Sequence, residues 1–226
     1  MRNKRIMAKA GISKTLIAYQ EATLSKGVRC MDKYTITIGR EYGSGGRLIG
    51  RQLAQELGIA FYDRELIVMA ARESGFDEGF VQQMEQKRTI SFISNLYLIG
   101  YELPVSEQIF LAQSKVIQKV AEESSCVIVG RCADYVLRDK PNCIRIFIHA
   151  PMEERIKRVR EVYGEDKPNL EDYIRKQDKN RAAYYNYYTQ NKWGRAQNYH
   201  LCIDSSIGIP ASVRIIKELV TEFTKR

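Results

Sequence analysis

Short apolar runs alternate with amphipathic segments along the chain, and this alternation constrains the fold more than any other feature. Each run is five to eight residues long, contains β-branched or aromatic residues, and is followed by a segment with a helical repeat. Strands that alternate with helices through short connections predict a parallel sheet covered by helices on both faces. The runs are residues 33–38, 59–63, 126–130, 143–150 and 199–204.

The segments between these runs carry apolar residues at helical spacing. Ile49, Leu53 and Leu57 recur every four residues up to Gly58, which predicts a helix that stops at this glycine. Pro151 precedes "MEERIKRVREVYG", which predicts a helix with proline at its first position. Further helices are predicted over residues 64–73, 105–120, 170–188 and 210–223.

The length of 226 residues suits one domain with an insertion. We predict a basic N-terminal extension at residues 1–31 and one domain at 32–226. Within that domain, the irregular segment 74–104 is the predicted insertion. Residues 160–182, which hold a polar, loop-like stretch at 163–169 and the start of the charged helical segment after it, form the predicted lid region. A solvated, charged helix is the plainer interpretation of that last segment.

The net charge of +9 is concentrated in the extension, where residues 1–30 hold seven Lys or Arg and only one acidic residue, Glu21. A loosely held leader is the preferred interpretation, and a basic helix on a membrane or partner is the alternative. The extension lacks the apolar region of a secretory signal, and no stretch of about 18 apolar residues occurs. The five Cys include no C-x-x-C pair and there are only two His, so we expect a cytoplasmic protein without structural zinc.

The first run leads into a glycine-rich segment, "TITIGREYGSGGRLIG" at residues 35–50. In the usual phosphate-binding loop, G-x-x-x-x-G-K-(S/T), backbone N–H groups cradle phosphates and a Lys reaches the outer ones. Here Arg40 stands at the first Gly position and Gly46 at the Lys position. Either this is a structural turn, or the clustered N–H groups and helix N-terminus still bind phosphate and Arg40 or Arg47 supplies the charge.

Charged residues follow several of the predicted strands. In an open parallel sheet, ligands bind beyond the carboxyl ends of the strands. Gly39–Arg47, Asp63 with Arg64, and Arg131 after Gly130 all occupy such positions. Taken singly, these residues could be a helix cap or solvated Arg residues on the surface. Their joint position at one edge of the sheet favours a ligand-binding site.

Five motifs in order resemble the cytidylate kinase-like branch of P-loop nucleoside monophosphate kinases. The resemblance runs from about residue 33 to the C-terminus, through motifs that are each moderately specific. They are "GSGG" at 43–46, "FYDRE" at 61–65, "IVGRCAD" at 128–134, "FIHAPMEERIKR" at 147–158 and "DKNRA" at 178–182.

This resemblance implies a three-layer P-loop fold, with a parallel sheet of about five strands, a helical substrate-binding insertion and a lid. It implies transfer of the γ-phosphoryl group of ATP, with Mg²⁺, to CMP or dCMP. Such a transfer is expected to use several Arg side chains that converge on the phosphates from separate loops. The expected partners are therefore ATP and the monophosphate, with no strong case for nucleic acid or a membrane.

The resemblance also implies roles for individual residues. The expected ATP-binding residues are Arg40, Gly43, Ser44, Gly45, Gly46 and Arg47; the expected substrate-binding residues are Asp63, Arg64, Arg131 and Asp134; the expected catalytic residues are Arg47, Arg155, Asp178 and Arg181. Arg158, one turn from Arg155, joins them as a candidate, and no metal ligand is assigned.

Three departures from the family pattern leave alternatives open. Gly46 replaces the loop Lys, Cys132 replaces an Asp after "GR", and His149 replaces a frequent Asp; Asp134 is a candidate to supply the missing carboxylate. A kinase for another small-molecule acceptor and a non-catalytic nucleotide-binding regulatory protein therefore remain as rival functions.

A cluster of aromatic residues, "YYNYYTQNKW" at 184–193, follows the predicted lid. Helix packing or a crevice wall is the preferred interpretation, and stacking on bases is the alternative. His149 and His200 are weak candidates for a general base, with His149 ahead because it ends a predicted strand.

Overall fold

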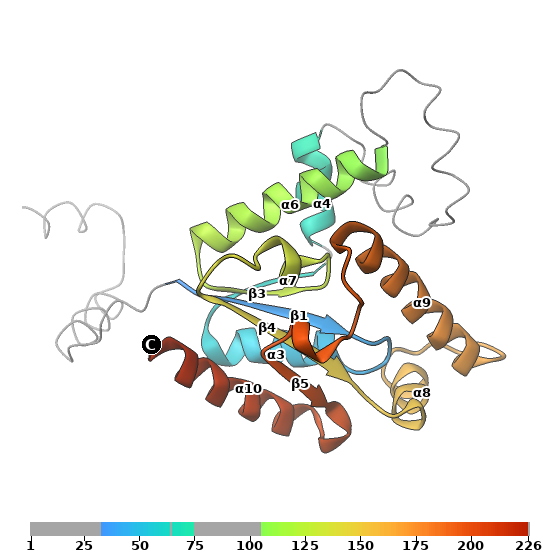
Figure 1. Ribbon diagram of the computed structural model, residues 1–226. Coiled ribbons are helices and arrows are strands. Elements are labelled where there is room, and N and C mark those ends of the chain that lie inside the picture. The colour runs from blue at the N-terminus through green and yellow to red at the C-terminus, as the bar shows by residue number, and fades with distance from the viewer. Residues whose placement is uncertain (1–32, 64, 75–104, 226) are drawn as a thin grey trace, which may run out of the picture. The chain divides into compact units, whose positions relative to one another are not determined.

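The computed structural model describes residues 33–63, 65–74 and 105–225, which belong to one compact unit of the chain, Lys33–Arg226 (Figure 1). The predicted extension, Arg64 and nearly all of the predicted insertion lie outside the described residues. Within the described ranges, no helix is both long enough and apolar enough to cross a membrane.

The described unit is built on a sheet of five strands that pair in parallel in the order β2-β3-β1-β4-β5. β1 lies in the middle and ends with Arg40, which is paired with Ile148 of β4. The prediction of a parallel sheet of about five strands is confirmed. The strands are β1 (Thr35–Arg40), β2 (Ala60–Tyr62), β3 (Cys126–Val129), β4 (Cys143–His149) and β5 (Leu201–Asp204).

Helices follow or precede each strand, as the alternation predicts. They are α3 (Gly46–Leu57), α4 (Glu65–Ser74), α6 (Val105–Glu123), α7 (Ala133–Val136), α8 (Met152–Glu161), α9 (Leu170–Thr189) and α10 (Ile209–Thr224), with 3₁₀ turns at Ala196–Asn198 and Ser205–Ile207.

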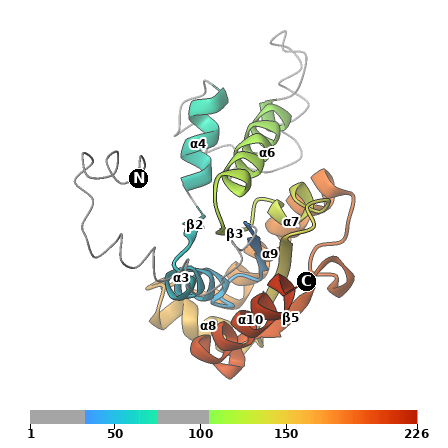
Figure 2. The ribbon, with the colours of Figure 1, turned by 90° about the vertical axis from the view of Figure 1, so that its left-hand side faces the viewer.

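Two apolar layers hold the helices on the sheet. α3 and α10 cover one face, where Ile49 and Val213 meet fully buried strand residues such as Ile146. α4, α6 and α7 cover the other, around Leu66 and Ile117. The two views agree on this three-layer arrangement (Figures 1 and 2). A fully buried Ile side chain stabilises the fold by about 2 kcal/mol.

The structure differs from the sequence predictions at several element ends. β1 extends to Arg40 rather than ending at residue 38, which places this Arg in the sheet. Pro151 caps α8 from outside instead of occupying its first position. α7 was not predicted, because four residues are too few to show a helical repeat. Ser205 opens a short 3₁₀ turn between β5 and α10.

Candidate functional site

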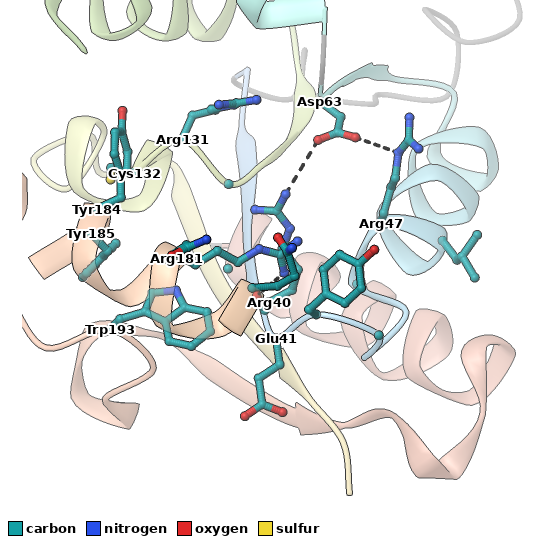
Figure 3. Close-up of a pocket in the computed structure, with 18 of the residues that line it drawn as sticks. Arg40, Glu41, Arg47, Asp63, Arg131, Cys132, Arg181, Tyr184, Tyr185 and Trp193 are labelled. Carbon is teal, nitrogen blue, oxygen red and sulfur yellow. Dashed lines mark hydrogen bonds and ion pairs between the residues drawn. The ribbon is translucent and has the colours of Figure 1, made fainter. Parts of the chain in front are cut away.

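A cavity of about 940 Å³ opens beyond the carboxyl ends of β1 and β3, at the edge of the sheet where a ligand was predicted. The phosphate loop, the turn after β3 and α9 all contribute to its walls (Figure 3). Of the predicted site residues that the structure describes, this cavity brings together Arg40, Gly43, Gly46, Arg47, Asp63, Arg131, Asp134 and Arg181.

The glycine-rich segment forms a loop that ends at the N-terminus of α3. Gly45 adopts φ 79° as the residue before the helix, a conformation that a side chain would strain. The Ser44 hydroxyl is fully buried and donates to the Glu41 carbonyl at 2.9 Å, while the Ser205 hydroxyl donates to the Ser44 carbonyl at 2.5 Å. Ser44 therefore fixes the shape of the loop from within, and its hydroxyl is not part of the cavity wall.

Three guanidinium groups, those of Arg40, Arg131 and Arg181, line the middle of the cavity (Figure 3). Arg181 donates from Nη1 to the Arg40 carbonyl at 3.1 Å and lies over the Tyr42 ring at 5.1 Å. Burial and the nearby charge of Arg181 lower the pKa of Arg40 to about 9, and burial also lowers the pKa of Arg181. Guanidinium groups held this close together create a positive potential that favours a bound anion.

The carboxylate of Asp63 connects two of the Arg residues. It lies 2.6 Å from Arg47 Nε and 3.8 Å from Arg40 Nη2, and only 8 % of its side chain is exposed. Arg47 is 43 % exposed and belongs to the rim of the cavity. Asp63 therefore forms ion pairs with both guanidinium groups, the closer one with Arg47.

Arg155 and Asp178 lie behind the phosphate loop rather than in the cavity wall. The Arg155 side chain is 6 % exposed, donates from Nε to the Tyr42 carbonyl at 2.7 Å, and pairs with Glu41 at 3.3 Å and with Asp178. Asp178 also accepts from the Tyr42 N–H at 2.7 Å. Arg158 donates to the Gly43 carbonyl at 2.7 Å. These contacts tie α8 and α9 to the backbone of the loop.

The turn after β3 has an unusual backbone that presents Arg131 to the cavity. Gly130, Arg131 and Cys132 adopt φ values of 78°, 58° and 54° in succession. Left-handed conformations cost non-glycine residues of the order of 1 kcal/mol each, so they persist where the surrounding structure holds them. The buried Cys132 side chain anchors this turn beneath the Arg.

The far end of the cavity is polar and aromatic. Asp134 is 7 % exposed and accepts a hydrogen bond from the Tyr185 hydroxyl at 2.7 Å. Tyr184 and Trp193 also line this end (Figure 3). Tyr188 stacks on Phe110 of α6 at 4.2 Å. The aromatic cluster thus combines helix packing with a cavity wall, which were the two preferred interpretations.

The buried carboxyl of Asp134 gives a pH prediction. Burial raises the pKa of Asp134 above 3.8, whereas the hydrogen bond from Tyr185 and the charge of Arg145 act to lower it. Cys143 and Tyr199 also interact electrostatically with this carboxyl. In the window just above pH 3.8, the Asp134 carboxyl therefore keeps its proton in the folded protein and loses it in the unfolded chain, so the contribution of this group to stability falls as the pH rises through that window. We expect Asp134→Asn, which keeps an acceptor for Tyr185, to gain Tm relative to wild type as the pH rises above 3.8. A Tm difference that does not change with pH would contradict this.

An aromatic group on the loop and lid was missed by the sequence analysis. The Tyr42 ring meets Tyr163 at 6.2 Å and Tyr173 at 5.6 Å edge to face, and its hydroxyl donates to Glu165. All four line the cavity. Their positions follow no spacing rule, because they come together only when the segment after α8 folds over the loop. His149 and His200 are not among the described residues that line the cavity.

Comparisons with known proteins agree on the fold and on a kinase-like protein. Residues 35–207 match the model of the cytidylate kinase-like family. An uncharacterized protein from Eubacterium ventriosum is 30 % identical, with a TM-score of 0.63, over 84 % of this chain and 99 % of its own. Shikimate kinase from Bacteroides thetaiotaomicron is 15 % identical, with a TM-score of 0.52, over 83 % and 98 % of the two chains. A gluconokinase from Sinorhizobium meliloti is 12 % identical, with a TM-score of 0.56, over 87 % and 96 %. None of the curated proteins compared matches the chain.

Proposed function

The chain belongs to the cytidylate kinase-like family, and from this we propose that it transfers the γ-phosphoryl group of ATP to a pyrimidine nucleoside monophosphate, CMP or dCMP. The observation that carries the proposal is the convergence of Arg40, Arg131 and Arg181 on one cavity beside a glycine loop and a helix N-terminus. Phosphoryl transfer needs positive charge around the equatorial oxygens and in-line positioning, and it needs little covalent help.

The parts of the cavity suggest a division of labour. The N–H groups at the start of α3 would bind the donor phosphates. Arg131 would bind the acceptor phosphate through its guanidinium fork, and Arg181 would stabilise the charge on the group in transfer. We assign Arg155 and Asp178 as positioning residues, because their charged groups contact each other and the glycine-rich loop and do not line the cavity.

Magnesium would neutralise phosphate charge in such a reaction. The first turn of α3 reads Gly46, Arg47, Leu48 and so offers no hydroxyl ligand. Asp63 already forms ion pairs with two Arg, whereas Glu165 Oε2 has no hydrogen-bond partner among the described residues. These donors fit an ion held mainly by phosphates and water, with Glu165 as its protein ligand.

Two other functions fit parts of the molecule. The polar, aromatic end of the cavity would also suit another small-molecule acceptor. The absence of a lysine at position 46 would suit a regulatory protein that binds the nucleotide without turnover.

An acceptor panel tests the proposal. ADP formation by the full chain with Mg-ATP would be measured with CMP, dCMP, UMP, AMP, GMP, shikimate and gluconate. We expect turnover with CMP and dCMP, and a fall in kcat/KM of about 10²-fold in Arg131→Ala. Arg138→Ala is the matched control, because this side chain is 49 % exposed and does not line the cavity. Turnover confined to shikimate or gluconate, or no turnover at all, would contradict the proposal.

A further inference from the structure

In the glycine-rich loop of this chain, a glycine and a basic residue have changed places relative to the usual phosphate-binding motif. In G-x-x-x-x-G-K, the first position is glycine and the seventh is the phosphate-binding lysine. Here the first position is Arg40 and the seventh is Gly46. The cationic side chain therefore enters the site from the end of β1 instead of from the start of α3.

The structure explains why the two changes occur together. A Cβ atom added to Gly46 would lie 2.6 Å from Arg40 Cβ and 3.1 Å from Arg40 Cγ. The stem of Arg40 therefore fills the space in which any side chain at position 46 would begin. Both positions cannot carry a long side chain unless the backbone moves, and close-packed interiors resist such overlap.

The other end of the same side chain lies over Gly130, whose φ of 78° already favours glycine. A Cβ atom on Gly130 would lie 2.0 Å from Arg40 Nη1 and 2.9 Å from Arg40 Cζ. The guanidinium group thus rests directly on the backbone of the turn after β3. Arg40 spans from the start of α3 to this turn, across the mouth of the phosphate loop.

Arg47, the other candidate for the missing charge, is more exposed than Arg40 and pairs more closely with Asp63. Its Nε lies 2.6 Å from Asp63, and 43 % of its side chain is exposed. Arg40 is 22 % exposed, and its nearest carboxylate oxygen among the described residues, on Asp63, is 3.8 Å away and shared with Arg47. Arg181 donates to the backbone carbonyl of Arg40, and the separation from Asp63 leaves the charge of the Arg40 guanidinium only weakly paired within this part of the chain.

We propose that Arg40 is the phosphate-contacting cation of this loop, in place of the usual lysine, and that position 46 is a glycine because the stem of Arg40 crosses it. The ligand is the polyphosphate chain of a nucleoside triphosphate. A guanidinium fork at this position binds two phosphate oxygens at once, whereas an ammonium acts as a point charge. The inference rests on the proposed function only for the identity of that ligand.

A swap of the two residues tests the inference. Binding of ATP and of inorganic tripolyphosphate to the full chain would be measured by calorimetry for wild type and four variants. These variants are Arg40→Met, Arg47→Met, Gly46→Lys and the double variant R40G/G46K. Arg40→Met keeps most of the stem over Gly46 and removes the charge, so we expect binding of both ligands to weaken about 10-fold to 100-fold. Arg51→Met, on the solvent-exposed side of α3, is the matched control.

The double variant gives the sharper result. We expect Gly46→Lys alone to lower both the Tm and the affinity for the two ligands, because the new side chain clashes with Arg40. We expect R40G/G46K to recover binding to within about threefold of wild type, because a lysine then occupies the usual position. The inference is overturned if Arg40→Met binds like wild type while keeping its Tm, if Arg47→Met weakens binding more than Arg40→Met, or if the double variant binds no better than Gly46→Lys.

These results separate the role of Arg40 from the kinase activity. If wild type binds ATP through Arg40 but never forms ADP, the role of Arg40 stands and the proposed kinase falls. If wild type turns over and Arg40→Met does so equally well, the kinase stands and the role of Arg40 falls. If wild type binds neither ATP nor tripolyphosphate, both fall.

Discussion

Replacing Arg155 with Met is expected to lower the free energy of unfolding by about 3 kcal/mol, which corresponds to a fall in Tm of roughly 6–12 °C. The Arg155 side chain is 6 % exposed and neutralises two carboxylates, Glu41 and Asp178. Methionine fills a similar volume, so the loss comes mainly from carboxylates left without their partner in a buried site. The Tyr42 carbonyl also loses its donor.

A matched substitution separates this effect from the change of residue type. Arg175 forms an exposed pair with Glu171 one helical turn away, and its side chain is 63 % exposed. We expect Arg175→Met to change stability by at most about 0.5 kcal/mol. Adding Asp178→Asn to Arg155→Met should recover part of the loss. If Arg155→Met unfolds at the wild-type temperature, then Arg155 does not hold the loop.

Replacing Arg181 with Met is expected to lower kcat about 10²-fold to 10³-fold with a smaller change in KM for CMP. Arg181 reaches the cavity from α9 and lies beside Arg40 and Asp63. A charge that acts mainly on the transition state lowers kcat, whereas one that binds both states equally raises KM. Steady-state kinetics with Mg-ATP and CMP measures the split.

Two further variants show whether Arg181 acts through its charge at the cavity. Lys179→Met lies on the same helix with an exposed side chain and should keep wild-type kinetics. Arg181→Lys retains the charge but loses the fork that meets the Arg40 carbonyl and a phosphate together. We expect Arg181→Lys to recover only part of kcat. Equal kcat in wild type and Arg181→Met would exclude the assigned role.

The position of the site was predictable because parallel strands end at one edge of the sheet. Asp63 and Arg131 follow β2 and β3 directly, so strand assignment alone brings them together. The different roles of Arg155 and Arg158 were not predictable, because both are Arg residues on the same helix, three positions apart. In the structure, Arg155 is the one that pairs with Asp178 of α9.

The choice between Arg40 and Arg47 also needed the structure. Both flank the glycine loop, and both carry the same charge. β1 is two residues longer at its end than the sequence predicted, and this places the Arg40 side chain against Gly46. Arg47 lies in the first turn of α3, and its side chain pairs with Asp63. This distinction depends on one- and two-residue differences at element ends, where sequence patterns are least informative.

The most direct test of a kinase with a lysine-free loop is the destination of the γ-phosphoryl group. ATP labelled in its γ-phosphate would be incubated with Mg²⁺, CMP and the full chain, and the labelled products separated. We expect the label to appear in CDP, and we expect Arg40→Met and Arg181→Met to slow its appearance. Label that stays in ATP despite measurable ATP binding, or that appears only in inorganic phosphate, would contradict it.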